Sequence, residues 1–225
     1  DLVHKNVAIF RSIIPEIARR NRDAILLIVS NPVDVLTWAA WKLSGYPANR
    51  VLGSGTVLDT ARLKYLLGER LGVDSRSVHA FIIGEHGDSE IAVWSTANIS
   101  GIPVNDFCEL RGHFEHDESM QRIAEDVKNS AYEIIAKKKA TYYGIAMSVK
   151  RICEAIVRDE KPILPVSNFQ NGVHGLHDVV LSMPAVVGKN GIKYQVPAPL
   201  SPDELARLHE SAKALREVID GLDLE

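Results

Sequence analysis

Cysteine is scarce in this sequence of 225 residues: there are two, Cys108 and Cys153, and they lie far apart. Neither has a second cysteine or a histidine at the spacing of a zinc finger. A disulfide framework is therefore excluded, and the simplest interpretation is two free thiols in a reducing, cytoplasmic setting. Two histidine pairs with a two-residue gap lack acidic or cysteine companions at metal-binding spacing, so we expect no metal site. These pairs are His113 with His116 and His174 with His177.

The sequence also lacks an excess of charge of one sign. Its 26 basic and 29 acidic side chains leave a net charge of −3, and the longest run of like charge is Lys137-Lys138-Lys139. We therefore expect neither a nucleic acid nor a membrane surface as partner. No apolar run approaches the ~20 residues of a membrane span, and the first residues do not form a signal peptide. The chain starts without Met and within a helical pattern, which indicates that it begins inside a longer protein.

Strand and helix patterns alternate over the first ~80 residues, which is typical of α/β proteins. Residues 24–30 form a continuous apolar run that ends at Asn31-Pro32, as expected of a parallel strand buried on both faces. Pro32 opens a helix that Gly45 closes. The further elements predicted in this part are a helix over 2–17, a strand over 50–52, a helix over 58–71 and a strand over 78–83.

The remainder of the chain combines long helices with antiparallel strands. Lys189-Asn190-Gly191 is an Asn-Gly hairpin signal between two predicted strands. Ser201 has the features of a helix cap, with a proline and acidic residues directly after it. We therefore predict an α/β fold in which part of a doubly wound parallel sheet precedes an α+β region with antiparallel strands. The elements predicted in this second part are helices over 119–138 and 140–159 and strands over 163–169, 179–187 and 192–196.

His86 follows the end of a predicted buried strand. Apolar, β-prone residues from Val78 to Ile83 stop at Gly84-Glu85-His86-Gly87. An open α/β sheet carries its chemistry at the carboxyl ends of its strands. Because an imidazole gains or loses a proton near neutral pH, His86 is a candidate general acid or base. A lone histidine on a turn is more often a surface-loop residue, so this assignment depends on partners elsewhere in the chain.

Asp59 and Arg62 are three residues apart in a predicted helix and therefore share one of its faces. A buried carboxylate beside an imidazole fixes its tautomer and raises its pKa, so Asp59 is a candidate partner that keeps His86 protonated. Arg62 offers a planar fork of donors that matches a substrate carboxylate. An ordinary ion pair on the helix surface is equally consistent with this spacing.

Asn31 ends the strand predicted over 24–30, on a prolyl turn. Its amide can donate a hydrogen bond to a carbonyl oxygen, although Asn-Pro is also a frequent turn pair without further function. Parallel strands would bring the ends that carry Asn31 and His86 to one edge of the sheet, together with the helix start that carries Asp59. We therefore predict one site with an acid–base histidine, its carboxylate partner and an arginine for an anionic substrate.

Four motifs occur in a fixed order along the chain. They are Ser30-Asn31-Pro32-Val33-Asp34, Gly53-Ser54-Gly55 with Leu58-Asp59-Thr60-Ala61-Arg62, Gly84-Glu85-His86-Gly87-Asp88 and Ala140-Thr141-Tyr142-Tyr143-Gly144. Together they resemble the L-lactate dehydrogenases, with the related malate dehydrogenases as cousins, and the resemblance extends over essentially all of the chain. It implies that residues 1–53 are the remainder of a Rossmann-like, dinucleotide-binding domain and that residues 54–225 are the substrate and catalytic domain. It also implies a cytoplasmic homo-oligomer, a dimer or a tetramer, that serves glycolysis and fermentation.

The resemblance implies a role for each site residue. His86 donates and accepts the proton, Asp59 orients it, and Arg62 binds the carboxylate of pyruvate or L-lactate. Asn31 positions the reacting oxygen and the nicotinamide of NAD. Reducing pyruvate takes a hydride at the carbonyl carbon and a proton at the oxygen, which an imidazolium supplies. The resemblance further places Val29, Ser54 and Ile145 at the nicotinamide end and Thr141 in the substrate pocket.

Three departures from the family pattern accompany this resemblance. Lys64 and His79 stand where bacterial members bind fructose 1,6-bisphosphate at a dimer interface through an arginine and a histidine. Lysine keeps the charge but lacks the bidentate fork, so an effector site is a weaker expectation here. Lys139 stands where the family usually has a glycine. The 225 residues also lack the Gly-rich pyrophosphate loop and the loop whose arginine polarises the carbonyl, so we expect this chain alone to bind NADH poorly and turn over slowly.

Two other functions stay open on the sequence alone. The first is a malate dehydrogenase, because the residue that best separates the two activities lies in the absent loop. Lactate is favoured because Gly84-Glu85-His86-Gly87-Asp88 resembles the lactate enzymes more than the malate enzymes. The second is a non-catalytic, truncated oligomerisation module built on the helical interfaces of the family.

Overall fold

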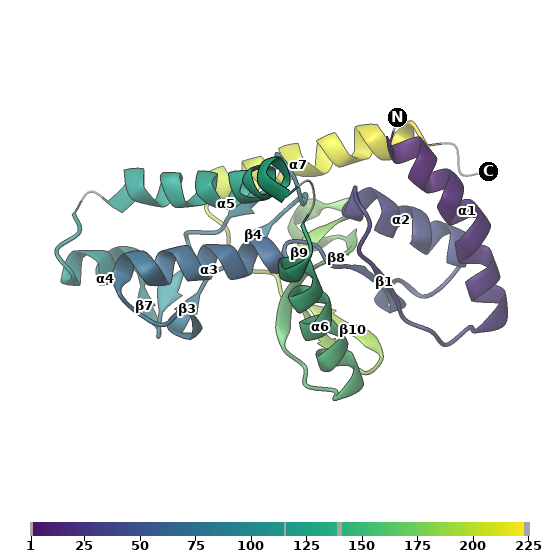
Figure 1. The fold of residues 1–225 in the computed structure, drawn as a ribbon, viewed down its shortest axis with the longest axis horizontal. Helices are drawn as coiled ribbons and strands as arrows, with labels where there is room; N and C mark the ends of the chain where they lie inside the picture. Colours follow the sequence, from purple (N-terminus) through teal and green to yellow (C-terminus); the bar gives the residue numbers. More distant parts are fainter. Residues whose placement is uncertain (1, 115, 139–140, 223–225) are drawn as a thin grey trace.

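The chain is arranged around one mixed sheet, and helices extend from it in different directions (Figure 1). The computed structural model describes residues 2–114, 116–138 and 141–222. The helices are α1 (Leu2–Arg20), α2 (Val33–Ser44), α3 (Val57–Leu71), α4 (Val104–Leu110), α5 (His116–Lys138), α6 (Tyr143–Val157) and α7 (Pro202–Asp220). The strands are β1 (Leu26–Ile28), β2 (Val51–Gly53), β3 (Val78–His79), β4 (Ile82–Ile83), β5 (Ile91–Ala92), β6 (Asn98–Ile99), β7 (Ile102–Pro103), β8 (Ile163–Asn171), β9 (His177–Gly188) and β10 (Gly191–Gln195). Short 3-10 turns occupy Ala48–Arg50, Ser75–Ser77 and Val173–Gly175.

The central sheet has the strand order β1-β2-β8-β9-β10. Its first pair, β1 with β2, is parallel, and the other pairs are antiparallel, so the predicted combination of a parallel part with an antiparallel part is confirmed. The sheet continues from residues 1–53 into the rest of the chain, because Gly53 at the end of β2 pairs with Ser167 in β8. A Cβ on Gly53 would lie 2.8 Å from Ser167 Oγ, so only glycine fits this crossing.

The single strand predicted over 78–83 is wrong in one respect. It is two short strands in two different small sheets, β3 paired with β6 and β4 paired with β5, and both pairings are antiparallel. The apolar run indicated burial correctly: Val78, Ile82 and Ile83 are buried. A run of apolar residues reports burial and does not identify the partner strand. The strand that leads to His86 is therefore not a parallel neighbour of β1.

The predicted helices and turns are largely confirmed. Gly45 ends α2 with a φ of +63°, and Ser201 opens α7 with a capping box in which the Glu204 backbone N–H donates to its side chain. Lys189 and Asn190 link β9 to β10 as the hairpin signal predicted. The helix predicted over 140–159 begins at Tyr143 and ends at Val157. Lys139, singled out as a departure from the family pattern, lies outside the described residues.

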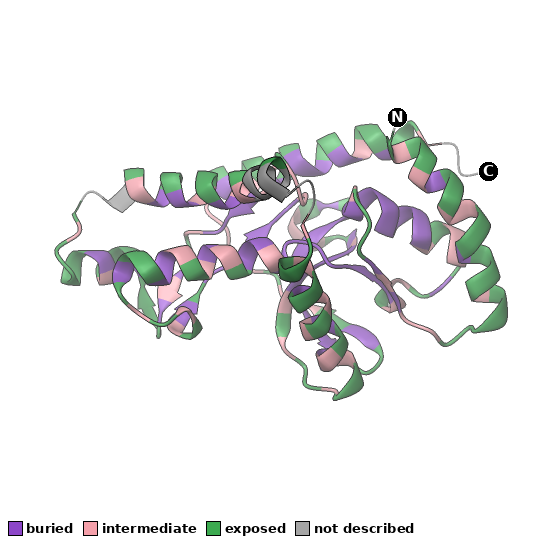
Figure 2. Ribbon diagram, viewed as in Figure 1, coloured by how far each residue is buried: buried purple, intermediate pink, exposed green. Residues whose placement is uncertain are grey.

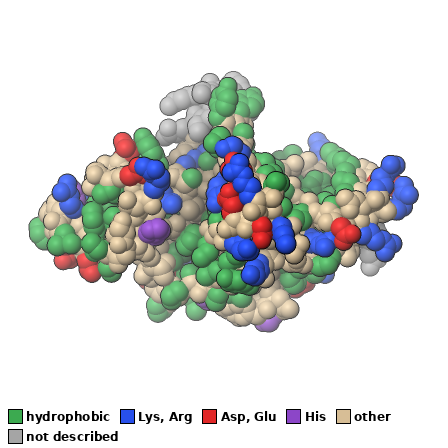
Figure 3. Space-filling model, turned by 90° about the horizontal axis from the view of Figure 1, so that it is seen from below, with side chains coloured by type: hydrophobic (Ala, Val, Ile, Leu, Met, Phe, Trp, Pro, Cys, Tyr) green, Lys and Arg blue, Asp and Glu red, His purple; other side chains and the backbone are tan. Residues whose placement is uncertain are grey.

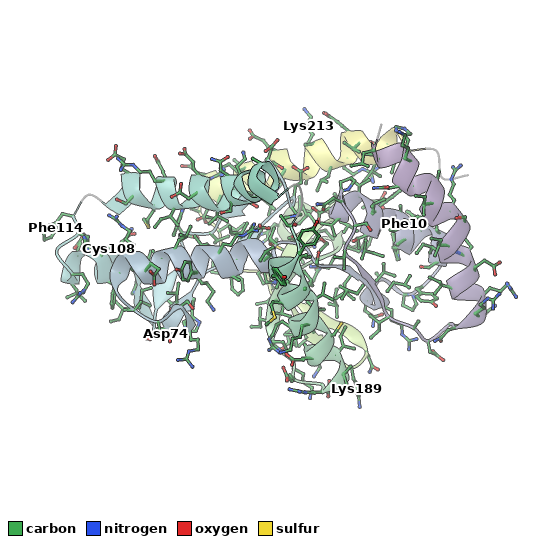
Figure 4. All side chains as sticks on the ribbon, in the orientation of Figure 1. Phe10, Asp74, Cys108, Phe114, Lys189 and Lys213 are labelled. Carbon is green, nitrogen blue, oxygen red and sulfur yellow. The ribbon has the colours of Figure 1, made fainter. Side chains whose placement is uncertain are left out.

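Burial is concentrated in the sheet and in α2, as Figure 2 shows. Residues 33–40 of α2 are all buried, whereas α1 buries Val7 and Ile14 and leaves most of its other residues exposed. Phe10 points from α1 toward α2 and packs against the same core (Figure 4). The first two turns of α2, which follow Asn31-Pro32, are therefore surrounded by other parts of the chain.

The surface charges and the two cysteines are as the composition predicted. On the face shown in Figure 3, acidic and basic side chains are interspersed. Cys108 is buried on α4, where it packs with residues of α3 (Figure 4). Cys153 is exposed on α6, and both cysteines are free thiols. Within the described part of the chain, no helix combines the length and the apolar character needed to cross a membrane.

Candidate active site

The turn that carries His86 is anchored before it reaches the histidine. Gly84 exchanges two backbone hydrogen bonds with Ser182 of β9, at 2.9 and 2.8 Å. The next residue, Glu85, donates its N–H to the Ser211 hydroxyl of α7 at 2.9 Å. Gly84 has a φ of +87°, a conformation that favours glycine. The chain therefore leaves β4 in a fixed direction, and His86 projects from an anchored turn.

Asp59 holds the imidazole of His86. The Nδ1 atom of His86 lies 2.7 Å from Oδ2 of Asp59, which stands in the first turn of α3 and is 3% exposed. The other oxygen, Oδ1, accepts a hydrogen bond from Nη1 of Arg62 at 3.1 Å. The three residues that the sequence singled out therefore meet in one site. With Nδ1 directed at Asp59, Nε2 is the ring nitrogen left for a substrate.

The surroundings of His86 favour its charged form. Burial alone would lower the pKa of the imidazole, but the hydrogen bond and the negative charge of Asp59 outweigh it, with further contributions from the charges of Asp34 and Glu90. The net effect raises the pKa of His86 to about 9. The imidazole therefore carries a donatable proton at neutral pH.

A cavity of about 380 Å³ opens beside the imidazole. Its apolar lining includes Leu2, Val3 and Pro32, and its polar lining includes Asp59, His86, Glu90 and Lys128. Asn31, which is exposed and precedes a cis peptide bond, also lines it. Ligand pockets are mostly apolar with a few convergent polar groups, and this cavity has that character on a small scale.

Glu90 and Lys128 were missed by the sequence reasoning. One carboxylate oxygen of Glu90 is buried without a hydrogen-bond partner among the described residues, and burial together with the charge of Asp59 raises its pKa. Lys128 reaches the same cavity from α5. The position of Glu90, four residues after His86, was the available signal, but nothing local distinguishes it from a surface acid.

Three groups offer ligand atoms that lie within 4.8 Å of one another, from Asp59, His86 and Glu90. Arg62 already supplies a positive charge to Asp59, and the imidazole satisfies its second oxygen. The carboxylate is thus neutralised by side chains of this chain. The expectation of a site without a metal stays a prediction.

Four other predicted site residues do not line this cavity. Ser54 is buried and donates its N–H to the carbonyl of Ile28 at 2.8 Å, and Val29 is exposed at the end of β1. Thr141 and Ile145 are half-buried at the start of α6. That start lies against α3, because a Cβ on Gly144 would be 3.1 Å from the side chain of Leu58, the residue before Asp59. The start of α6 therefore lies next to the start of α3, which carries Asp59.

Lys64 of α3 and His79 of β3 line a second cavity of about 570 Å³. Arg151 of α6 lines the same cavity. Burial lowers the pKa of Lys64. Lys64 and His79, the two residues predicted to form an effector site, therefore line one cavity. This cavity shares no lining residue with the cavity beside His86.

A histidine paired with a buried carboxylate, beside an arginine and at the edge of a mixed α/β sheet, defines an enzyme that transfers protons at small anionic substrates. Sequence models of both domains of one enzyme family match the chain: the lactate/malate dehydrogenase NAD binding domain over residues 1–53, and the lactate/malate dehydrogenase alpha/beta C-terminal domain over residues 56–223. The chain belongs to the lactate/malate dehydrogenase family.

Individual relatives share this assignment. An L-lactate dehydrogenase of Acetivibrio thermocellus is 53% identical over 224 residues, which cover 100% of this chain and 71% of that protein. The L-lactate dehydrogenase 1 of Clostridium acetobutylicum is 50% identical over 222 residues, with 99% and 71% covered. Among solved structures, the minor L-lactate dehydrogenase of Enterococcus mundtii in its ligands-bound form superposes with a TM-score of 0.95 at 44% identity, covering 100% of this chain and 71% of that chain.

Proposed function

We propose that this protein interconverts pyruvate and L-lactate with NAD as the hydride carrier. The observation that carries the proposal is the His86–Asp59–Arg62 arrangement: a protonated imidazole held at 2.7 Å by a buried carboxylate, beside a guanidinium. A 2-oxo acid needs both groups, since it carries a carboxylate to bind and a carbonyl oxygen to protonate. The relatives named as L-lactate dehydrogenases support the choice of substrate.

His86 and Asp59 perform the proton transfer. In pyruvate reduction, Nε2 of His86 gives its proton to the carbonyl oxygen. The Nδ1 proton stays on the ring, and Asp59 accepts its hydrogen bond and stabilises the imidazole. In lactate oxidation, the neutral Nε2 accepts the hydroxyl proton, and the imidazolium that forms is stabilised by Asp59. Arg62 donates a hydrogen bond to the second oxygen of Asp59 and so holds this carboxylate in place beside the imidazole.

Arg62 and Asn31 are proposed to orient the substrate. The guanidinium of Arg62 has donors beyond the one it directs at Asp59, and these match a substrate carboxylate. Asn31 reaches the cavity from the turn after β1, where its amide can donate to the reacting oxygen. Thr141, at the start of α6, is proposed to close the pocket around the substrate methyl group.

The residues of the cavity fit the nicotinamide end of NAD. Val3 and Pro32 supply apolar lining and His86 supplies polar lining, which suits a flat ring lying beside a small polar substrate. When bound, the nicotinamide supplies or accepts the hydride. Val29, Ser54 and Ile145 are proposed to hold this end of the cofactor together with Asn31.

Spectroscopy tests the proposal directly. The intact protein is assayed for pyruvate-dependent oxidation of NADH and for lactate-dependent reduction of NAD by absorbance of the reduced nicotinamide. We expect both reactions, with a kcat/KM for pyruvate at least about tenfold above that for oxaloacetate. A preference for oxaloacetate would instead identify a malate dehydrogenase, and a folded oligomer without either activity would support the non-catalytic module.

The protein is further proposed to work in the cytoplasm as a homo-oligomer. Large apolar side chains stand exposed on α6, among them Tyr143 and Val157, each 82% exposed. Exposed apolar surface of this kind is typical of association faces. Light scattering after size-exclusion chromatography gives the mass in solution, and a monomer at micromolar concentration would contradict this proposal.

The second cavity is proposed to bind fructose 1,6-bisphosphate. Lys64, His79 and Arg151 line it, and cationic donors of this kind bind phosphate groups. Lysine makes a weaker phosphate contact than arginine because it lacks the planar fork. A moderate effect of the bisphosphate on pyruvate saturation is therefore expected.

A further inference from the structure

Asp34 is a buried carboxylate to which the proposed reaction assigns no role. It stands in the first turn of α2, is 2% exposed and does not line the cavity beside His86. Its two oxygens bind different segments of the chain. Oδ2 accepts the backbone N–H of His86 at 2.7 Å, and Oδ1 accepts the hydroxyl of Ser167 in β8 at 2.6 Å. A charge buried in this way needs such partners, and charge-assisted hydrogen bonds are the strong kind.

The hydrogen bond from His86 completes the anchoring of the histidine turn. Gly84 is held by Ser182 and Glu85 by Ser211, so the residues before His86 are bound to β9 and α7. The N–H of His86 itself is bound to Asp34. This bond is the last fixed point of the backbone before the imidazole, and it sets the direction from which the ring approaches Asp59.

Asp34 also belongs to the segment that carries Asn31. Asp34 follows Asn31 by three positions. The turn between them is fixed by the backbone bonds of α2, in which the Leu36 N–H donates to the carbonyl of Pro32 at 3.0 Å. The same carboxylate therefore joins the turn that presents Asn31 to the turn that presents His86. Two groups that must face one substrate are tied together through one buried side chain.

We infer that Asp34 is a positioning residue for proton transfer: its carboxylate fixes the main chain of His86 against the turn of Asn31, so that the imidazole stays between Asp59 and the substrate. The inference rests on the proposed function, since it concerns how the same site is held. It assigns a function to the last residue of the Ser30-Asn31-Pro32-Val33-Asp34 motif, which the roles of Asn31 and His86 leave unexplained.

The electrostatics of Asp34 support this role. Burial raises the pKa of its carboxyl to about 6, while the hydrogen bonds from Ser167 and His86 act in the opposite direction. The charged groups that act on it are His86, which favours its ionised form, and Glu85, which opposes it. Asp34 is therefore ionised at neutral pH, and its charge in turn helps to keep His86 protonated.

The test compares Asp34→Asn with the matched variant Ser167→Ala in the intact protein. Ser167→Ala removes the other hydrogen bond of the same carboxylate and leaves the bond to His86. We expect Asp34→Asn to lower kcat for pyruvate about tenfold or more and to lower the pKa of His86 by about one unit in an NMR titration of the imidazole. Asp34→Asn keeps an amide oxygen that can still accept the His86 N–H, but as an uncharged and therefore weaker acceptor. Ser167→Ala should keep kcat within about twofold, although it loses a buried hydrogen bond and some thermal stability. NADH binding, followed by fluorescence, should be unchanged in both.

A measurement on the unchanged protein covers the case in which Asp34→Asn does not fold. The amide signal of His86 should move with pH and show an inflection near the pKa of Asp34, about 6, because its hydrogen-bond acceptor titrates there. The inference is overturned if this inflection is absent, or if folded Asp34→Asn keeps the wild-type kcat and imidazole titration. It is equally overturned if both variants lose kcat in proportion to their loss of thermal stability. A wild-type protein that fails to reduce pyruvate defeats the proposed function alone, since the NMR titrations still decide the role of Asp34.

Discussion

Helix α3 borders two cavities that surround their cationic residues in opposite ways. In the first cavity, His86 is held by the buried carboxylate of Asp59, with Asp34 and Glu90 near enough to act on its charge. In the second, no ion pair to Lys64 or His79 is found among the described residues, whereas the third basic residue, Arg151, is paired with Glu160. Burial accordingly lowers the pKa of Lys64, whereas the carboxylates raise the pKa of His86 to about 9.

This difference in carboxylate partners suits the two cavities to different functions, although both contain a histidine. A histidine with its own carboxylate is charged before any ligand arrives, so it is ready to give a proton. Basic residues without a carboxylate obtain their counter-charge from a ligand, which suits an anion-binding site. The presence or absence of a buried acid, rather than the histidine itself, distinguishes the cavity proposed for catalysis from the cavity proposed for anion binding.

The largest expected effect is the loss of the proton donor. His86→Gln keeps the size of the side chain and removes its titration, so kcat for pyruvate reduction should fall about 10²- to 10⁴-fold, the usual contribution of a general acid. NADH binding measured by fluorescence should remain. The control is His177→Gln, since His177 is an exposed histidine at the start of β9. Loss of NADH binding in His86→Gln would show that the histidine serves the cofactor and would remove the contrast between the cavities.

Arg62→Lys tests the proposed contact between Arg62, which is paired with Asp59 beside the cavity, and the substrate carboxylate. Lysine keeps the ion pair with Asp59 but lacks the planar fork, so kcat/KM for pyruvate should fall about 10- to 100-fold, which corresponds to a charge-assisted hydrogen bond of about 1.5–3 kcal/mol. The loss should appear mainly as a higher KM. Arg76→Lys, in an exposed ion pair with Asp74, is the matched control. Equal kinetics in the two variants would mean that Arg62 does not contact the substrate.

The pH dependence of the two reaction directions tests the charge of His86. Because its pKa is raised from 6.5 to about 9, the imidazolium and its attraction to Asp59 are fully present below pH 6.5 and are lost as the pH rises through about 9. We expect kcat/KM for pyruvate to hold up to about pH 8 and then to fall about tenfold per unit above pH 9, while lactate oxidation rises. Glu90→Gln should move this transition to lower pH. A midpoint near 6.5 would show that Asp59 does not hold the ring charged.

The smallest expected effect belongs to the second cavity. Fructose 1,6-bisphosphate should lower the KM for pyruvate about fivefold in the intact oligomer. Lys64→Met should abolish this change in KM, and it should not alter the pyruvate saturation curve measured without the bisphosphate. Lys189→Met, at the exposed β9–β10 hairpin, is the control substitution. If the bisphosphate does not move the pyruvate saturation curve, the proposal that this cavity binds an effector is wrong.

Several features of the fold follow from short stretches of sequence. The ends of α2 and α7 are predictable because Gly45 and Ser201 act through their own backbone conformation and side chain within one helical turn. The link between β9 and β10 is predictable for the same reason, since Asn190-Gly191 is a local turn signal. His86, Asp59 and Arg62 could be selected because their motifs are compact and their spacing on a helix or turn is fixed.

Other features depend on residues that meet only in the folded chain. The run 78–83 is divided between two antiparallel pairs, because partner choice is decided by packing against α3 and β9 and an apolar run is compatible with several partners. The roles of Asp34 and Glu90 also come from tertiary contacts: Asp34 is 52 positions from His86 and 133 from Ser167 in sequence. Local patterns encode periodicity, caps and turns, so the sequence by itself determined the elements and the chemistry of His86. The buried carboxylates that set its charge and direction were decided by the tertiary structure, because a carboxylate acts on an imidazole through distance and burial.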